Sequence, residues 1–347
     1  MTTPTDPKYA TTKPPLGVEK ARVDLLLDES HQSAFQSAVR NVLQTEIAEI
    51  TFAQIIDGLP LKDVGLGTRG LHWETLNDHE KLCAGVLEKA KAFLGDFTPL
   101  QMELQVEALR RYQKCPTDSS TSKLPLVELV VIAMHRIAML LHKLDNPHRK
   151  DGTQMDTLCS TRGRASTVFH PTPFCLPDYA DPAQYPEAVD DLPGYWAEDR
   201  IFGGVVLFGR GQDGTECKDV WLHSHRKGLT HRICALNDHQ FDTLVHFLES
   251  PDIGDENPCP LPILVDKTNR RRVDEGIAIP EYNIYRDRWE RKIRFSDYEE
   301  FEWIHGGNCC LSEADYPELE ATRLYIQNYF KDVDTESTDG SSPPPSS

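Results

Sequence analysis

The stretch of sequence that decides the fold spans residues 201–248 and reads IFGGVVLFGRGQDGTECKDVWLHSHRKGLTHRICALNDHQFDTLVHFL. Three short segments rich in apolar and β-branched residues, at 201–208, 217–226 and 230–235, predict three β-strands. Glycine-containing turns separate the segments, and connections this short join antiparallel neighbours. The stretch therefore predicts a small antiparallel sheet in the C-terminal half of the chain.

A helix is predicted directly after the third strand. Asn237 to Gln240 has the form of a capping box, and the apolar residues that follow recur at helical spacing: Phe241, Leu244, Val245 and Leu248. Because Val220 and Leu222 give the second strand one apolar face, we expect this helix to lie on that face of the sheet. The opposite face carries polar residues that are candidates for a site.

Those polar residues permit three interpretations. We expect the face formed by Trp221, His223 and His225 to be a solvated sheet surface. His223 and His225 lie two residues apart on a strand and point the same way, so together with His231 they are also candidate zinc ligands. A two-residue turn would place His231 on the other face, whereas an odd-length turn would bring it opposite His225. The third interpretation is a site for an anion or small molecule, formed by Trp221, His223, His225 and Arg232.

A second candidate site is a basic and aromatic cluster at 269–294. It contains eight basic and five acidic residues, a net of +3 in a chain whose formal charge is −18. Arginine forks interleaved with aromatic rings can hold phosphate or carboxylate groups, which makes Arg286, Arg288 and Trp289 candidate ligand-binding residues. We expect intramolecular ion pairs with the acidic excess to satisfy most of these arginines. An anion pocket is the alternative.

The first half of the chain is predicted to be helical. Apolar residues at three- and four-residue spacing indicate helices at 30–57, 82–94 and 98–112. The first of these ends at Gly58, and the third begins with a capping box that contains proline at its first helical position. Three amphipathic helices need a common apolar partner.

The segment 124–144 is the predicted partner, because it is apolar nearly all the way round. Its length raises the question of a membrane span, but Glu128, His135 and Arg136 lie in its middle, where charges are costly in lipid. We therefore interpret it as the central helix of a bundle. His135 and His142 share one face of this helix, and we interpret them as satisfied core residues rather than as ligands.

These segments together predict an α+β protein in which an N-terminal helical lobe packs against a C-terminal lobe with a small antiparallel sheet and short helices. The expected divisions are a disordered N-terminus at 1–18, the helical lobe at 19–145, a linker and extended Pro/Asp/Tyr-rich arm at 146–200, the α+β lobe at 201–331 with a last helix at 317–330, and a disordered tail at 332–347. The run HGGNCC at 305–310 has the residues of a nucleophile loop, but sequence neighbours rarely pair in this way.

Composition restricts the compartment and the partners. The formal charge of −18 opposes binding of the body to nucleic acid or to an anionic membrane. The first 15 residues lack the apolar core of a signal peptide, which favours a cytoplasmic protein and leaves the nucleus open. Nine cysteines at irregular spacing, with no CxxC pair, then indicate reduced thiols. The sequence has no P-loop, GxGxxG, GxSxG, HExxH or EF-hand pattern.

Three runs carry a resemblance to other proteins: IFGGVVLF from Ile201, GTECKDV from Gly214 and AIPEYNIYRDRWERK from Ala278. They resemble runs in proteins of filamentous fungi with no assigned activity, so the resemblance implies no function. We expect a soluble intracellular module that binds a small molecule or a protein without catalysis. The alternative is an enzyme with its site in the groove between the lobes, where Trp221, His223, His225 and Arg232 act on an anionic or metal-bound substrate. Zinc is the cofactor that this second reading would use.

Overall fold

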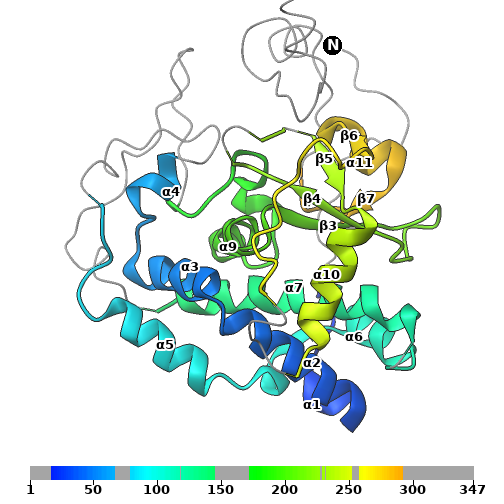
Figure 1. The fold of residues 1–347 in the computed structure, drawn as a ribbon, viewed down its shortest axis with the longest axis horizontal. Helices are drawn as coiled ribbons and strands as arrows, with labels where there is room; N and C mark the ends of the chain where they lie inside the picture. Colours follow the sequence, from blue (N-terminus) through cyan, green and yellow to red (C-terminus); the bar gives the residue numbers. More distant parts are fainter. Residues whose placement is uncertain are drawn as a thin grey trace, which may run out of the picture.

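A computed structural model describes residues 17–66, 79–117, 119–144, 172–226, 229–230, 232–251 and 258–291. It shows an α+β fold in which most helices lie on one side and a five-stranded antiparallel sheet on the other, with helix α9 between them (Figure 1). Several predicted features lie outside the described residues: His231, the run at 305–310, the helix at 317–330, the tail at 332–347 and the terminus up to residue 16.

The first predicted helix is divided into two. Helix α2 (Glu29–Leu43) is followed by α3 (Glu46–Asp57), because the Thr45 side chain accepts a hydrogen bond from the Ala48 amide and caps a new helix. Gly58 ends α3 with a φ of 95°, a conformation that glycine adopts without strain. The predicted stop at Gly58 is therefore confirmed, whereas the single long helix was wrong. Two short helices flank this pair, α1 (Val23–Leu26) and α4 (Lys62–Leu66).

The third predicted helix begins later than its sequence suggests. After α5 (Val86–Asp96), the chain forms a 3-10 turn, η3 (Pro99–Gln101), and a short strand, β2 (Glu103–Gln105). This strand pairs with β1 (Lys20–Arg22), which satisfies its backbone groups in an extended form, and α6 (Val106–Gln113) follows. Strand pairing with a distant segment overrides the local helical signal.

Helix α7 (Ser120–His142) is the central helix, as predicted. It packs against α9, α6, α2 and α3, and its apolar residues are buried nearly all round. Within the described part of the chain, it is the one helix long and apolar enough to cross a membrane by length and composition, but 78% of its most apolar window is buried inside the protein. Burial of this kind is typical of the core helix of a globular protein.

The predicted extended arm is the part of the chain whose structure differs most from the prediction. Three 3-10 turns, η4 (Pro177–Tyr179), η5 (Pro182–Gln184) and η6 (Ala188–Asp191), lead into helix α9 (Leu192–Phe202), in which every residue is buried. Gly203 ends α9 with a φ of 100°, so the first strand of the sheet starts at Val205 and not at Ile201. A helix buried on all sides shows no amphipathic period, which explains why its sequence looked irregular.

The sheet has the strand order β6-β5-β4-β3-β7, all antiparallel. Its strands are β3 (Val205–Gly209), β4 (Val220–His223), β5 (Ile233–Ala235), β6 (Arg272–Val273) and β7 (Ile284–Tyr285). Helix α11 (Glu275–Tyr282) connects the last two. The three predicted strands and their antiparallel pairing are confirmed with shifted ends.

Helix α10 (Asp238–Glu249) begins with the predicted capping box. Its buried residues, including Leu244, pack chiefly against α2 and α7 rather than on the sheet. The Asn41 side chain of α2 donates hydrogen bonds to the carbonyls of Phe247, Leu248 and Ser250 at 2.9, 3.2 and 2.8 Å, so α2 caps the end of α10. One continuous apolar core joins the helices and the sheet.

Candidate metal centre

The polar side of strand β4 is buried. The side chains of His223 and His225 are 0% and 1% exposed, and Trp221 is 5% exposed. Tyr179 of η4 covers the two histidines, with its ring centroid 5.7 Å from that of His223 and 5.6 Å from that of His225. The expectation of a solvated sheet surface was therefore wrong, because a distant segment packs over it.

Four side chains converge at this place, from three different elements. His225 Nε2 lies 2.8 Å from Asp178 Oδ2, and His223 Nε2 lies 3.1 Å from Glu275 Oε2 and 3.9 Å from Asp178 Oδ2. The two imidazole centroids are 4.5 Å apart. We call Asp178, His223, His225 and Glu275 the His223 cluster.

The local fold positions each member of the His223 cluster. His223 ends β4 opposite Val205, and the chain then leaves the sheet, with the His225 amide donating to Asp199 of α9 at 2.8 Å. Asp178 lies in the 3-10 turn η4, next to the buried Tyr179. Glu275 is the first residue of α11, where the Asp274 side chain caps the helix.

Tyr179 also supports His223 by a hydrogen bond. Its hydroxyl lies 3.1 Å from His223 Nδ1, on the other side of the ring from Glu275. Burial raises the pKa of Tyr179 well above its usual value, so the hydroxyl keeps its proton over the physiological range. The ring of His223 is thereby held at both nitrogen atoms.

Arg291 lies beside the His223 cluster, and its charged guanidinium is short of hydrogen-bond acceptors. Its side chain is 4% exposed, and its guanidinium carbon lies 5.9 Å from the centre of the Tyr179 ring. Burial lowers the pKa of Arg291, but the acidic side chains around it outweigh this effect and raise it. Its one ion pair is a 3.5 Å contact from Nε to Glu290, and none of its three nitrogen atoms has a hydrogen-bond partner in the described part of the chain.

The donor set of the His223 cluster suits a divalent transition metal. Zinc is held by imidazole nitrogen and carboxylate oxygen at about 2.0–2.2 Å, so tetrahedral ligands lie about 3.3–3.5 Å from one another. The observed separations of 2.8, 3.1 and 3.9 Å bracket that value. Asp178, His223 and His225 each offer a ligand atom within 4.8 Å of the other two, and Glu275 meets this group at His223 Nε2.

The other residues proposed with these histidines do not join them. Trp221 Nε1 donates to Asp219 at 2.7 Å, and Arg271 lies over its indole ring at 4.9 Å. Arg232 is half-buried, and the contacts of 2.8, 3.1 and 3.9 Å that define the His223 cluster do not involve it. The third predicted zinc ligand, His231, lies outside the described part of the chain. Asp178 and Glu275 contribute the oxygen donors instead.

Three residues of the basic and aromatic cluster line a groove of about 970 Å³ between the helical side and the sheet. Arg286, Arg288 and Trp289 line this groove. The Arg286 guanidinium forms a buried ion pair with Glu198 and stacks on Tyr195, with its carbon 5.0 Å from the ring centre. The intramolecular pairing expected from the sequence is therefore observed for Arg286.

Glu128 pairs with two arginines that line the same groove. Burial opposes ionisation of this carboxyl, but Arg210 and Arg111 outweigh it and lower the pKa of Glu128 below its usual value. Arg210 donates to it at 2.7 Å, and Arg111 lies 2.5 Å away. These arginines are occupied by protein partners, so the groove offers fewer free donors than its composition suggests.

The two histidines of α7 are satisfied core residues, as interpreted from the sequence. His135 Nδ1 lies 2.6 Å from Glu198 Oε1, and His142 Nδ1 lies 3.0 Å from Asp190 Oδ1. Both side chains are buried. Their carboxylate partners come from α9 and η6 and link these elements to α7.

Sequence reasoning located two of the four donors in the His223 cluster. Asp178 lies in a segment without a period, and Glu275 follows His225 far beyond the spacing of a local ligand motif. No signal in the sequence joined them. Family models, curated proteins and solved structures give no match to this chain. The functional conclusion therefore depends on the chemistry of the site.

Proposed function

We propose that this protein binds a divalent transition metal of the zinc class at the His223 cluster and uses it to hold a small anionic molecule. Three contacts of 2.8, 3.1 and 3.9 Å link the two imidazoles and the two carboxylates, and they carry this proposal. Imidazole suits zinc, copper, iron and nickel, and the carboxylates balance the charge of a dication. Such a site in a −18 chain also explains how two acidic side chains can share one partly buried place.

The hydrogen bonds at the two histidines agree with metal binding. Each Nε2 faces a carboxylate oxygen, which can only accept, so either a ring proton on Nε2 or a metal ion lies between nitrogen and oxygen. When a metal ion lies there, each ring carries its proton on Nδ1. The Nδ1–H of His223 then donates to the Tyr179 hydroxyl, an outer hydrogen bond of the kind that orients metal-ligating imidazoles.

Arg291 supports the second half of the proposal, the binding of an anion. A guanidinium has five N–H donors, and leaving buried donors without acceptors costs about 1–3 kcal/mol for each group, or more when it is charged. Arg291 is 4% exposed and its nitrogen atoms have no hydrogen-bond partner among the described residues. A carboxylate or phosphate ligand would satisfy these donors by a bidentate contact.

The donor count favours binding over catalysis. Structural zinc sites have four protein ligands, whereas catalytic sites keep one position open for water or substrate. The His223 cluster supplies four donors, of which the Glu275 side chain is the most exposed at 27%. This arrangement favours a metal-dependent binding protein.

The experiment is zinc and phosphate titration of the tag-free protein by calorimetry. His225→Ala should lose one equivalent of bound zinc, and the matched control His246→Ala, at an exposed position of α10, should lose none. Arg291→Gln should keep the zinc but lose the zinc-dependent binding of inorganic phosphate. Retention of the full zinc stoichiometry in His225→Ala would overturn the metal site. Retention of phosphate binding in Arg291→Gln would overturn the role of Arg291.

A further inference from the structure

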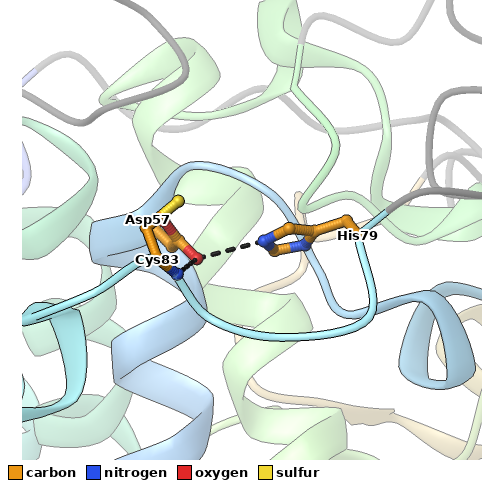
Figure 2. Close-up of side chains that lie close together, drawn as sticks. All are labelled: Asp57, His79 and Cys83. Atoms are coloured by element: carbon orange, nitrogen blue, oxygen red, sulfur yellow. Dashed lines mark hydrogen bonds and ion pairs between the residues drawn. The ribbon is translucent and has the colours of Figure 1, made fainter.

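A second cluster of potential metal ligands lies on the helical side, remote in sequence from the first. Asp57 is the last residue of α3, and His79 and Cys83 lie on the segment that leads into α5. Figure 2 shows the His79 ring and the backbone nitrogen of Cys83 both directed at the Asp57 carboxylate. One ligand atom from each residue lies within 4.8 Å of the other two. Asp57 is 0% exposed and His79 is 7% exposed.

The hydrogen bonds of His79 are the informative feature of this second cluster. Its Nδ1 lies 2.8 Å from the Pro60 carbonyl oxygen, and its Nε2 lies 3.1 Å from Asp57 Oδ2. Both oxygens can only accept, so the Pro60 contact places a ring proton on Nδ1. A neutral imidazole would then point a lone pair from Nε2 at a carboxylate oxygen. A proton or a metal cation between Nε2 and Asp57 removes that repulsion.

Cys83 supplies a third donor of a different kind. Its amide donates to Asp57 Oδ2 at 2.9 Å, which fixes the start of the segment against the end of α3 (Figure 2). A nucleophilic role does not fit, because both nitrogen atoms of His79 face oxygen acceptors and neither is available as a base for the thiol.

We propose that Asp57, His79 and Cys83 form a second zinc site, independent of the His223 cluster, which clamps the two ends of the 58–82 connection together. The set of thiolate, imidazole and carboxylate is one that zinc accepts, with water as the fourth ligand. The Pro60 carbonyl holds His79 in the tautomer that presents Nε2 to the metal. Metal binding would join the end of α3 to the start of α5 and stabilise this part of the fold.

Sulfur makes this site distinguishable from the first. The His223 cluster contains no cysteine, so of the two clusters only the one with Cys83 can give a thiolate-to-cobalt charge-transfer band in cobalt-loaded protein, and Cys83→Ala assigns the band to that thiol. The wild-type chain and His225→Ala should both show this band. Cys83→Ala and His79→Ala should lose it, and the control Cys259→Ala, at an exposed cysteine, should keep it.

Absence of the band from the cobalt-loaded wild-type protein would overturn the proposal, and so would its persistence in Cys83→Ala. The wild-type measurement decides the question even if a variant fails to fold. A thiol-reactivity assay gives a second reading, in which zinc should slow modification of Cys83 at least tenfold in the wild-type chain but not in His79→Ala. Equal reactivity with and without zinc in the wild-type chain would also overturn it. Loss of zinc from the His223 cluster alone leaves both readings unchanged.

Discussion

The two donor clusters have the same kind of polar core but different surroundings, and this difference suggests different roles. The His223 cluster has two carboxylates and two imidazoles, with the buried guanidinium of Arg291 beside it. The cluster of Asp57, His79 and Cys83 joins two segments close in sequence and includes a thiol. A metal ion next to an arginine with N–H donors can bind an anion together with that arginine. A metal ion that joins two chain segments stabilises them instead.

The largest expected effect is on metal affinity at the His223 cluster. His225→Ala removes a nitrogen donor and should weaken zinc binding there by more than about 100-fold, because the loss of even an outer hydrogen bond costs about 10–100-fold. A chelator-competition titration checks this value. His79→Ala should leave the affinity of the His223 cluster unchanged. A parallel loss in both variants would mean that the clusters are one coupled unit.

A core substitution should separate loss of fold from loss of metal. Leu244 of α10 is 2% exposed and packs toward α2 and α7. Leu244→Ala should lower the free energy of unfolding by about 2–5 kcal/mol, as other large-to-small changes in cores do. Urea denaturation measures it. Zinc bound per folded chain should not change, and a fall in stoichiometry would show that metal content merely follows global stability.

The outer hydrogen bond of His223 gives the next effect. Tyr179→Phe removes the hydroxyl that lies 3.1 Å from Nδ1 and keeps the ring that covers the cluster. Zinc affinity at the His223 cluster should fall by about 10–100-fold. The same titration measures it, with Tyr185→Phe as the control, since the Tyr185 hydroxyl donates to the Glu290 carbonyl instead. An unchanged affinity in Tyr179→Phe would contradict the metal-bound tautomer.

A pH effect on stability is expected beside Arg291. Burial raises the pKa of Glu290 to about 6, above the value of about 4.3–4.5 expected in the unfolded chain. The folded state therefore favours the protonated carboxyl, and the stability that this contributes is present below pH 4.5 and lost as the pH rises through 6. The change is about 2 kcal/mol for about 1.5 pKa units.

Glu290→Gln tests that pH dependence directly. The amide keeps the shape of the carboxyl and cannot ionise, so the variant should lose the decline in unfolding free energy between pH 4.5 and pH 6.5. Urea denaturation at several pH values measures the slope. The wild-type slope in the variant would show that another group titrates, and that the carboxyl beside Arg291 is not the one that is buried and neutral in acid.

The parts of the fold that were predictable from sequence are those with a local signal. The capping box at Asn237 and the apolar spacing around Leu244 predicted α10 because both act within a few residues. Helix α9 was missed because it is buried on every side and contains Pro193 and Gly194, which look like loop residues. The packing of α10 on α2, held by Asn41, is a long-range contact with no local signature.

The site follows the same division between local and distant signals. The spacing of His223 and His225 on one strand was readable, because side chains two residues apart on a strand share a face. Their burial was not, since it depends on Tyr179 from a segment without a period. Asp178 and Glu275 reach the histidines only through the tertiary fold. Local spacing therefore identified half of the donors, but the prediction that they are exposed to solvent was wrong.

The measurement that tests the central claim most directly is the number of zinc ions bound to the wild-type chain and to the double variant His223→Ala/His225→Ala, counted by native mass spectrometry after removal of free metal. The account predicts a zinc ion at the His223 cluster that is present in the wild-type chain and missing from the variant, with the ion at Asp57, His79 and Cys83 retained in both. Equal zinc content in the two proteins, or none in the wild-type chain, would contradict it.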